Sequence, residues 1–595
     1  MALTSALSEA LLLHTSGSAA PGPPPPSAGS ELPPCSGAPV HRDHHPADLV
    51  FLGGPVYTVD PARSWAGAVA VRDGRIVTVG QDADVRPLIG PGTEVVDLAG
   101  RLLLPGFQDA HVHPVLAGTT LRTCDLHELH TAEEYVAAIA EYAATRPDAA
   151  WITGGGWSME AFPGGTPHRS LLDGIAAVRD RPVALPNRDG HGLWANSRAL
   201  EIAGIDAGTP DPADGRIERD ADGHPTGMLQ EGAAELVTRH IPATSEEERY
   251  KGLLAGQAYL HSFGITGWQD AAVGAAFGPG DVYGAYLRAD REGTLTARVR
   301  AALWWDREGG LEQLAGFQER RAEAERGGER FRAGTVKIML DGVAENHTAA
   351  MLEPYLDGCG CSSGNSGLDF VDPAKLGGYV AELDAAGFQV HFHALGDRAV
   401  RQALDAVEEA LRRNGDRGNR HHLAHLQVVH PDDIARFRTL GATANMQPLW
   451  ACHEPQMDEL TIPFLGERRS GWQYPFGSLL RSGAMLAAGS DWSVSTPDVL
   501  AGVHVAVNRT GEEEPNRVFG PEERIDLGSA LAAYTAGTAR VNHLDALTGS
   551  VESGKLADLV VLDRNPFDGP NQAIAETRVL RTYVQGELVH AAASA

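Results

Sequence analysis

The sequence has little cysteine, a deficit of positive charge and no long apolar run, and each shortage excludes a class of protein. Five cysteines, odd in number and scattered, argue against a disulfide framework and fit reduced thiols. Cys359 and Cys361 could bind a metal in principle, but the chain has no second such pair. Lys and Arg number 49 against 78 Asp and Glu, a formal net charge of −29. Nucleic acid and anionic membrane are therefore not expected as partners, because both attract a surplus of Lys and Arg.

No apolar stretch approaches the roughly 18 residues of a membrane-spanning helix. The apolar patch near the N-terminus has no Lys or Arg ahead of it, which argues against a secretory signal. We therefore expect a cytoplasmic location.

Proline is concentrated at the start of the chain. Residues 1–46 hold nine of the 37 prolines, with Ser, Gly and Ala between them, and this composition predicts a disordered tail. Short β-type runs follow at both ends of the remaining chain, with Asp73-Gly74 as a hairpin signal. We predict a small β-sandwich built from 47–106 and 541–595.

The middle of the chain alternates apolar strand-like runs with helical stretches, one of which opens at Thr131 with a capping-box pattern completed by Glu134. The predicted strands are 107–113, 265–270, 299–305, 336–341, 389–393, 421–427, 442–447 and 485–491. This repeated alternation predicts an α/β fold, a (β/α)8 TIM-like barrel over 107–540. About 150 residues separate the first two strands, too many for one connection. An inserted subdomain is expected there, over about 115–262.

Possible metal ligands end five of these strands. His111 and His113 lie two residues apart, so strand alternation points both imidazoles to one face, where they can bind one ion. The other four strands carry Lys337, His393, His425 and Asp491. Because the C-terminal ends of barrel strands converge and carry the active site, we expect these side chains to meet.

Each residue alone has an ordinary explanation. His393 is typical of a hydrogen-bonded core histidine, Asp491 of a helix N-cap, and Lys337 of a side chain that reaches solvent from the barrel. Burying such groups singly would be costly unless each were paired, and a metal accounts for all six together. The neighbours His391, Asp341, His421 and His422 are interpreted as supporting or structural residues.

Three segments are specific: His-Val-His at 111–113, His-Ala-Leu-Gly-Asp-Arg-Ala at 393–399 and Gly-Ser-Asp-Trp at 489–492. With further matches at 104–114, 190–200, 264–270, 336–342 and 549–558, the chain resembles the metal-dependent amidohydrolase superfamily. More closely it resembles the branch that includes the YtcJ-like proteins and N-substituted formamide deformylase. The resemblance covers residues 48–590 and implies a barrel with a β-sandwich from both termini.

The resemblance also implies the ligand set. His111 and His113 would bind the first, more buried metal, and His393 and His425 the second. Lys337 matches a lysine that reacts with CO₂ to give a carbamate bridging two metals. The expected cofactors are one or two divalent ions of the zinc class, with CO₂ as lysine carbamate.

Two further residues receive roles in this comparison. Asp491 would touch the first metal and shuttle a proton from the hydroxide to the leaving nitrogen. His191, in the expected insertion, would hydrogen-bond the oxyanion, unless it is a loop histidine near the mouth of the site. Trp157, Gln447, Trp450 and His453 are expected to line the pocket.

The leading prediction is a hydrolase of a non-peptide C–N bond, in an amide or an N-substituted formamide, with a small-molecule partner and a possible homodimer. A deaminase of an aminated heterocycle is the alternative. Many such deaminases lack the lysine, so Lys337 favours the first function. A third hypothesis is a non-catalytic barrel, but the presence of all six predicted ligands argues against it. Ala424 and the segment from Gly342 depart from the pattern of relatives, which leaves pocket shape and substrate open.

Overall fold

The computed structural model of the protein describes residues 45–593, except 128, 179, 275–279 and 513. The chain divides into two units, Met1–His45 and Pro46–Ala595, and the helices and strands described below belong to the second. Apart from its last two residues, the predicted tail at 1–46 lies outside the described residues. Its disorder stays a prediction.

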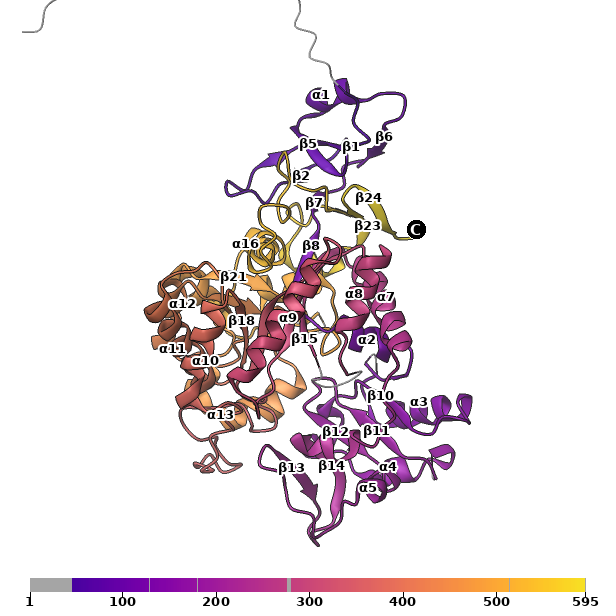
Figure 1. Ribbon diagram of the computed structural model, residues 1–595, viewed down its shortest axis with the longest axis vertical. Coiled ribbons are helices and arrows are strands. Elements are labelled where there is room, and N and C mark those ends of the chain that lie inside the picture. The colour runs from indigo at the N-terminus through magenta and orange to yellow at the C-terminus, as the bar shows by residue number, and fades with distance from the viewer. Residues whose placement is uncertain (1–44, 128, 179, 275–279, 513, 594–595) are drawn as a thin grey trace, which may run out of the picture. The chain divides into compact units, whose positions relative to one another are not determined.

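Eight parallel strands form one sheet in the order β21-β20-β19-β18-β17-β16-β15-β8. Figure 1 labels β8, β15, β18 and β21 among them. Their bounds are β8 Phe107–Val112, β15 Ile265–Val273, β16 Arg298–Trp304, β17 Phe331–Met339, β18 Gln389–Ala394, β19 His422–His425, β20 Thr443–Met446 and β21 Met485–Ala488. Beyond β21 the chain bonds back to β8, because Asp491 N–H donates to the His111 carbonyl and His113 N–H to that of Trp492, each at 2.8 Å. The sheet is thereby nearly closed, and the predicted α/β barrel is confirmed.

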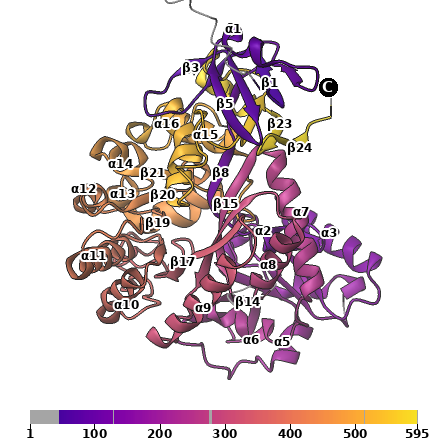
Figure 2. The ribbon, with the colours of Figure 1, turned by 45° about the horizontal axis from the view of Figure 1, so that its top comes forward.

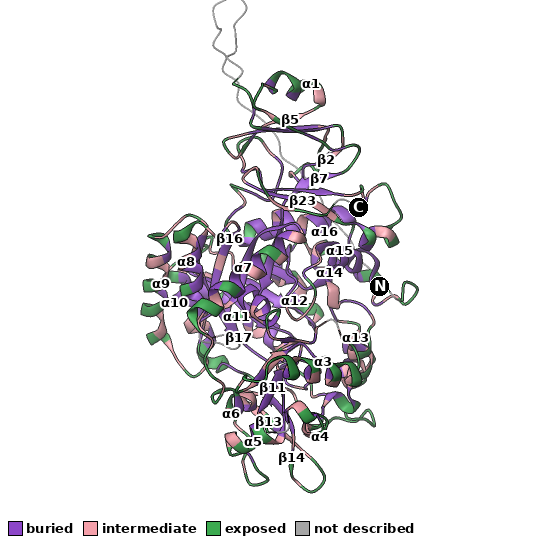
Figure 3. Cartoon of the chain, turned by 90° about the vertical axis from the view of Figure 1, so that its right-hand side faces the viewer, coloured by how far each residue is buried: buried purple, intermediate pink, exposed green. Residues whose placement is uncertain are grey.

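Helices surround this sheet because each has one apolar face. In α11, for example, residues buried at helical spacing include Val400, Ala403, Leu404 and Val407. The helices of the barrel are α2 Pro114–Thr120, α7 Glu246–Ser262, α8 Tyr283–Glu292, α9 Leu314–Glu325, α10 Pro373–Ala385, α11 Asp397–Asn414, α12 Pro431–Leu440, α13 Ile462–Ser470, α14 Phe476–Ser482, α15 Val499–Asn508, α16 Leu527–Ala532 and α17 Thr538–Val541. The strands of this sheet are mostly buried, whereas many exposed residues lie on the outer faces of the surrounding helices and in loops (Figure 3). In the part of the chain that the structure describes, no helix has the length and apolarity needed to cross a membrane.

Residues from both ends of the chain form two smaller sheets (Figure 2). One has the order β5-β4-β1-β6, with β1 Leu49–Leu52, β4 Ala68–Arg72, β5 Arg75–Gly80 and β6 Glu94–Asp97. The other has the order β24-β23-β22-β7-β2-β3, with β2 Val56–Tyr57, β3 Trp65–Ala66, β7 Leu103–Pro105, β22 Leu559–Leu562, β23 Val579–Val584 and β24 Glu587–Ala591. Phe51 of the first sheet packs edge-on against Tyr583 of the second at 5.1 Å. Asp73 and Gly74 both have positive φ between β4 and β5, as a tight hairpin turn requires.

A third sheet lies in the sequence between β8 and β15, in the order β13-β14-β12-β11-β10-β9. Its strands are β9 Cys124–Asp125, β10 Ile152–Gly155, β11 Val183–Pro186, β12 Gly192–Ala195, β13 Gly215–Arg219 and β14 Pro225–Glu231. Helix α3, Ala132–Thr145, begins at Thr131 with the predicted capping box to Glu134. The shorter helices α4 Arg169–Asp173, α5 Ser197–Ala203 and α6 Glu235–Thr238 complete the insertion. The domain boundaries proposed from the sequence, those of the insertion included, stay a prediction.

Candidate metal centre

Five barrel strands bring the six predicted ligands to one end of the sheet. The ligands lie on or just after β8 (His111, His113), β17 (Lys337), β18 (His393), β19 (His425) and β21 (Asp491). All six residues are buried, with exposed fractions of 9% or less. The expectation that these strand ends converge therefore agrees with the geometry.

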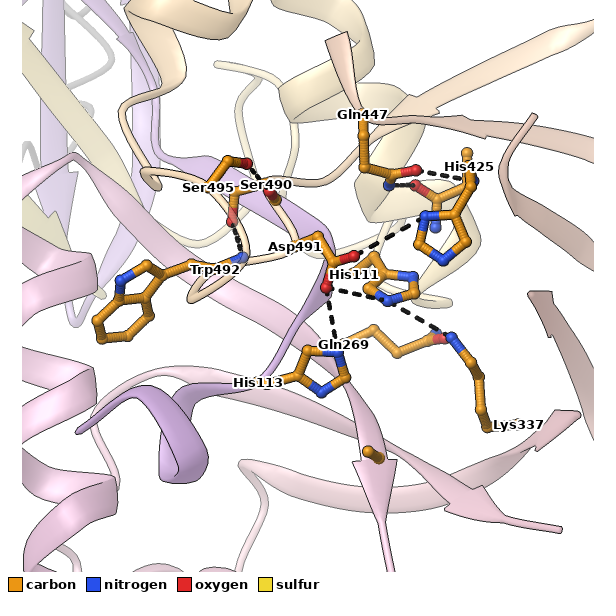
Figure 4. A network of polar contacts seen from close by, with 12 residues as sticks. His111, His113, Gln269, Lys337, His425, Gln447, Ser490, Asp491, Trp492 and Ser495 are labelled. Atoms are coloured by element: carbon orange, nitrogen blue, oxygen red, sulfur yellow. Dashed lines mark hydrogen bonds and ion pairs between the residues drawn. The ribbon is translucent and has the colours of Figure 1, made fainter. Parts of the chain in front are cut away.

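Asp491 lies at the middle of this group (Figure 4). Its Oδ1 is 3.1 Å from His113 Nε2 and 3.4 Å from His111 Nε2, and its Oδ2 is 3.8 Å from His425 Nδ1. Lys337 Nζ approaches the same Nε2 of His111 at 3.4 Å. A carboxylate, three imidazoles and an amine thus share one small buried volume.

His393 lies beside His425, with ring centroids 4.5 Å apart, and its Nε2 is 3.4 Å from the Gly342 carbonyl oxygen. His111, His425 and Asp491 each offer a ligand atom within 4.8 Å of the others. Within the described chain, both ring nitrogens of His425 and Oδ1 of Asp491 lack a hydrogen-bond partner. Such orphaned buried atoms are rare, and imidazole and carboxylate are donors that a divalent ion binds. The residues present therefore fit a metal.

The backbone is strained where two of these ligands are placed. His425 has φ 78° and Asp491 has φ 54°, in the left-handed region that side-chain-bearing residues seldom adopt. Gly489 is required just before Asp491, because a Cβ there would lie 2.6 Å from the backbone nitrogen of His111. Strain and close approach together aim the two ligands at the centre.

A chain of hydrogen bonds fixes which nitrogen of His111 is free. Gln389 donates its amide N–H groups to two main-chain carbonyls, so its Oε1 accepts from Gln269 Nε2 at 3.1 Å. Gln269 Oε1 then accepts from His391 Nδ1 at 2.7 Å, which leaves His391 Nε2 to accept from His111 Nδ1 at 2.9 Å. His111 consequently keeps the lone pair on Nε2, the atom that faces Asp491 and Lys337.

The residues that the sequence suggests as supporting or structural lie in this hydrogen-bond network or in the segments around it. His391 holds His111, and His422 Nε2 lies 3.0 Å from Gln269 Oε1. His421 pairs instead with Asp384 outside the centre, at 3.1 Å. Asp341 accepts three backbone N–H groups and organises the loops after β17 and β18. Gln269 itself was not singled out from the sequence, because the strand pattern gives no sign that it joins two histidines.

Burial dominates the electrostatics of the centre. It lowers the pKa of Lys337 to about 7, although Asp491 opposes the shift. Burial, together with nearby positive charge, also holds the pKa values of His111, His393 and His425 well below their usual range. The imidazoles are therefore neutral, as metal ligation requires.

His191 comes from the insertion and lies beside the centre, its ring centroid 5.6 Å from that of His393. Its Nδ1 is 2.9 Å from Glu231 Oε2, and Glu231 in turn accepts from Thr348 Oγ1 at 2.7 Å. Burial lowers the pKa of His191, but the charge and hydrogen bond of Glu231, together with the charges of Asp189 and Asp491, raise it to about 9. Glu231 is a site residue that sequence reasoning missed, since its link to His191 exists only after folding.

The centre opens into a cavity of about 300 Å³. Trp450 lines it and stacks on His425, with centroids 5.4 Å apart. Gln427 also lines it; its Nε2 donates to Glu345, so the unpartnered Oε1 remains to accept a hydrogen bond. The wall thus combines an aromatic face with acceptors.

Three of the four expected pocket residues are placed elsewhere, which corrects that prediction. Trp157 is fully buried in the core of the insertion, against Trp194. His453 pairs with Asp458. Gln447 does not line the cavity, and its Oε1 accepts a hydrogen bond from the backbone N–H of His425. Aromatic and polar residues near motifs could not be told apart from core residues without the fold.

A family model matches most of this chain. The model of the amidohydrolase family matches residues 94–590. The chain belongs to the amidohydrolase family. It is 34% identical to "Protein LONG AFTER FAR-RED 3" of Arabidopsis thaliana, over 91% of this chain and 92% of that protein. It is 30% identical to the N-substituted formamide deformylase of Arthrobacter pascens (91% and 98% covered) and 29% identical to the putative amidohydrolase YtcJ of Bacillus subtilis (91% and 99%).

A solved structure shares the fold of this amidohydrolase. An uncharacterised metal-dependent hydrolase from Pyrococcus furiosus superposes with a TM-score of 0.66 at 26% identity, covering 87% of this chain and 99% of that one. The predicted resemblance is therefore confirmed, and the chain is a metal-dependent hydrolase of carbon–nitrogen bonds. These comparisons do not support the deaminase alternative better than they support a hydrolase of C–N bonds.

Proposed function

We propose that this amidohydrolase cleaves a non-peptide C–N bond, in an amide or an N-substituted formamide. The observation that carries the proposal is the buried cluster of neutral imidazoles around Asp491, with orphaned atoms on His425 and Asp491. The likeness to a protein named N-substituted formamide deformylase supports the choice of substrate class.

The ligand set suits one or two ions of the zinc class. His111, His113 and Asp491 would hold the first, and His393 and His425 the second. When bound, such an ion lowers the pKa of water towards about 7 and polarises a carbonyl oxygen.

Asp491 and His191 are the residues proposed to act on the reacting groups. Asp491 accepts a proton from the attacking water and returns it to the leaving nitrogen, since a bare amide anion is a poor leaving group. His191, held through Nδ1 by Glu231, keeps Nε2 to donate a hydrogen bond to the oxyanion in the cavity that it lines.

Lys337 is proposed to be carboxylated. Its Nζ lies among the predicted ligands, 3.4 Å from His111 Nε2, where an ammonium would repel a bound cation. The neutral amine would add CO₂ and release a proton, and the carbamate would offer two oxygens that share one negative charge. Lys337→Ala should be nearly inactive, with partial rescue by added formate or bicarbonate. Wild-type rate and metal content in Lys337→Ala would instead make the lysine structural.

A small-molecule amide is the proposed partner, and the 300 Å³ cavity is of suitable size for one. Gln427 Oε1 and the Glu345 carboxylate favour a substrate that carries N–H donors away from the bond that breaks. Nucleic acid and membrane are not proposed as partners, given the net charge of −29. The homodimer and the cytoplasmic location stay predictions.

The test is a substrate panel offered to the metal-loaded protein: N-alkyl formamides, N-acyl amino acids and aminated heterocycles. We expect amine release from a member of the first two groups, abolished in His111→Ala. Ammonia release from a heterocycle, with no turnover of any amide, would move the assignment to a deaminase.

A further inference from the structure

A second cavity, of about 420 Å³, lies at the opposite end of the barrel from the metal centre. We call it the basal cavity and define it by Arg300, Arg332, Arg321, Asn419 and Asn542 among its lining residues. Arg300 and Arg332 lie near the first residues of β16 and β17, whereas Lys337 lies five residues further along β17. That separation is about 17 Å along the strand.

The basal cavity concentrates positive charge that carboxylates do not neutralise. Arg300 and Arg332 are direct neighbours in the parallel ladder, where like charges repel. In the described residues, no carboxylate lies within ion-pair distance of Arg300, Arg332 or Arg321. They donate to main-chain carbonyls, and Arg321 also lies over the Phe388 ring at 4.2 Å. Burial and the charges of Arg332 and Arg298 lower the pKa of Arg300 to about 10.

Asn542 gives an independent sign of a ligand. Its side chain is 99% buried, and its Oδ1 accepts from Gln269 Nε2 at 3.2 Å, which fixes the orientation of the amide. The Nδ2 group therefore remains as a donor, and it has no partner among the described residues. An unpartnered buried donor is rare, and this one belongs to a residue that lines the basal cavity beside the guanidinium groups.

The space and the charge both suit a dianion. A Cβ added at Gly334, on the same wall, would meet no atom within 4 Å, so the cavity is open there. Glu325, an exposed residue at the end of α9, is the one carboxylate among the described lining residues. Three guanidinium charges against this single carboxylate leave a surplus of two in a chain whose net charge is −29. Guanidinium groups bind phosphate oxygens in pairs, with charge-assisted hydrogen bonds.

We propose that the basal cavity is a binding site for a phosphate group, separate from the metal centre, with Arg300, Arg332 and the Asn542 amide as its donors. Free phosphate and a small phosphomonoester share this chemistry. The volume exceeds what a phosphate ion alone needs, so both are accommodated. The hydrogen bond from Gln269 joins Asn542 to the network that holds His111, which makes metal affinity a second property to follow.

The test is calorimetric titration of the full, metal-loaded chain with inorganic phosphate and, separately, with glycerol 3-phosphate, at constant ionic strength set with chloride. We expect saturable binding of both probes. Arg332→Gln should weaken it about tenfold or more, the loss expected for a charge-assisted hydrogen bond. Arg326→Gln is the matched control, since it removes an exposed positive charge at the end of α9 and should change nothing.

A metal-loaded centre also attracts phosphate, so His111→Ala separates the two sites. The proposal requires His111→Ala to retain phosphate binding. Absence of saturable binding in the wild type overturns the proposal, and so does loss in His111→Ala with retention in Arg332→Gln. If Arg332→Gln fails to fold, Arg321→Gln replaces it and should also weaken binding, because Arg321 is the third guanidinium that lines the cavity and lies on a helix outside the sheet. Binding of the phosphomonoester alone upholds the site and identifies an organic phosphate as its ligand.

Discussion

At the scale of single residues, the centre depends on side chains whose orientation other side chains impose. Asp491 is aimed by a strained backbone and by Gly489, His111 by His391 and Gln269, and His191 by Glu231. That the six residues bind a metal stays a prediction, but their meeting at one end of the sheet could be predicted, because strand ends and short motifs are visible in the sequence. Gln269 and Glu231 could not, because their partners are 122 and 40 residues away in the chain.

Asp491→Asn should lower the rate of amide hydrolysis more than the rate of hydrolysis of activated esters. An amide needs its leaving nitrogen protonated, and general acid–base help contributes about 10²–10⁴-fold. We expect a loss of that size on an N-alkyl formamide and a smaller loss on a nitrophenyl ester, measured at equal metal occupancy. Equal losses on both substrates would remove the proton-shuttle role and leave Asp491 as a ligand only.

Gln269→Leu should weaken metal binding without changing a ligand. The substitution removes the acceptor that sets the His391 tautomer, and such supporting contacts are worth about 10–100-fold in metal affinity. Competition with a chelator measures the metal Kd. Thr582→Val is the control, since it removes a buried hydrogen bond to the His261 carbonyl, far from the ligands in the fold. An unchanged Kd in Gln269→Leu would contradict the role assigned to the network.

At the scale of elements, backbone geometry rather than the side-chain pattern determines where the strands begin and end. The sixth and eighth predicted strands, 421–427 and 485–491, end early. The first ends at His425, where φ becomes positive, and the second ends at Ala488, three residues before the positive φ of Asp491. Strand β17 begins five residues before the predicted start, at Phe331. Arg332 and Gly334 do not look like barrel residues in a sequence, and in the fold they line the basal cavity.

Helix α2 begins at Pro114, directly after His113, and packs on α7 through glycine. A Cβ at Gly118 would lie 2.0 Å from the Gly252 carbonyl oxygen. Gly118→Ala should therefore lower stability by about 1–3 kcal/mol, the usual cost of overpacking, and lower the melting temperature. Gly316→Ala on α9 meets no atom within 4 Å and should be neutral or stabilising by up to about 1 kcal/mol. Equal shifts in the two variants would contradict this packing.

At the scale of the whole molecule, the sequence predicted the barrel and the pairing of both termini, because alternation and short β-runs are local signals. The insertion is predicted from its length alone. Its sheet order could not be predicted, since β12 pairs with β14 rather than with β13. The same limit explains Trp157. Its position near the motifs suggests a pocket residue, whereas in the fold it lies in the core of the insertion.

Residues 1–46 are predicted to be dispensable, because their composition cannot build a core. A chain that begins at Ala47 should melt within about 2 °C of the full chain, which corresponds to less than 1 kcal/mol, and keep its activity. A larger drop in melting temperature would mean that these residues pack on the barrel.

The central claim is that the six residues at the strand ends form a metal centre on which hydrolysis depends. The most direct test measures metal content and amide hydrolysis together, in wild type, in His111→Ala and in His393→Ala, before and after chelation and zinc readdition. The account predicts one to two ions per chain in active wild type, loss of metal and rate together on chelation, recovery together on readdition, and low values of both in the variants. Active protein with well under one ion per chain, or full activity after chelation, would contradict it.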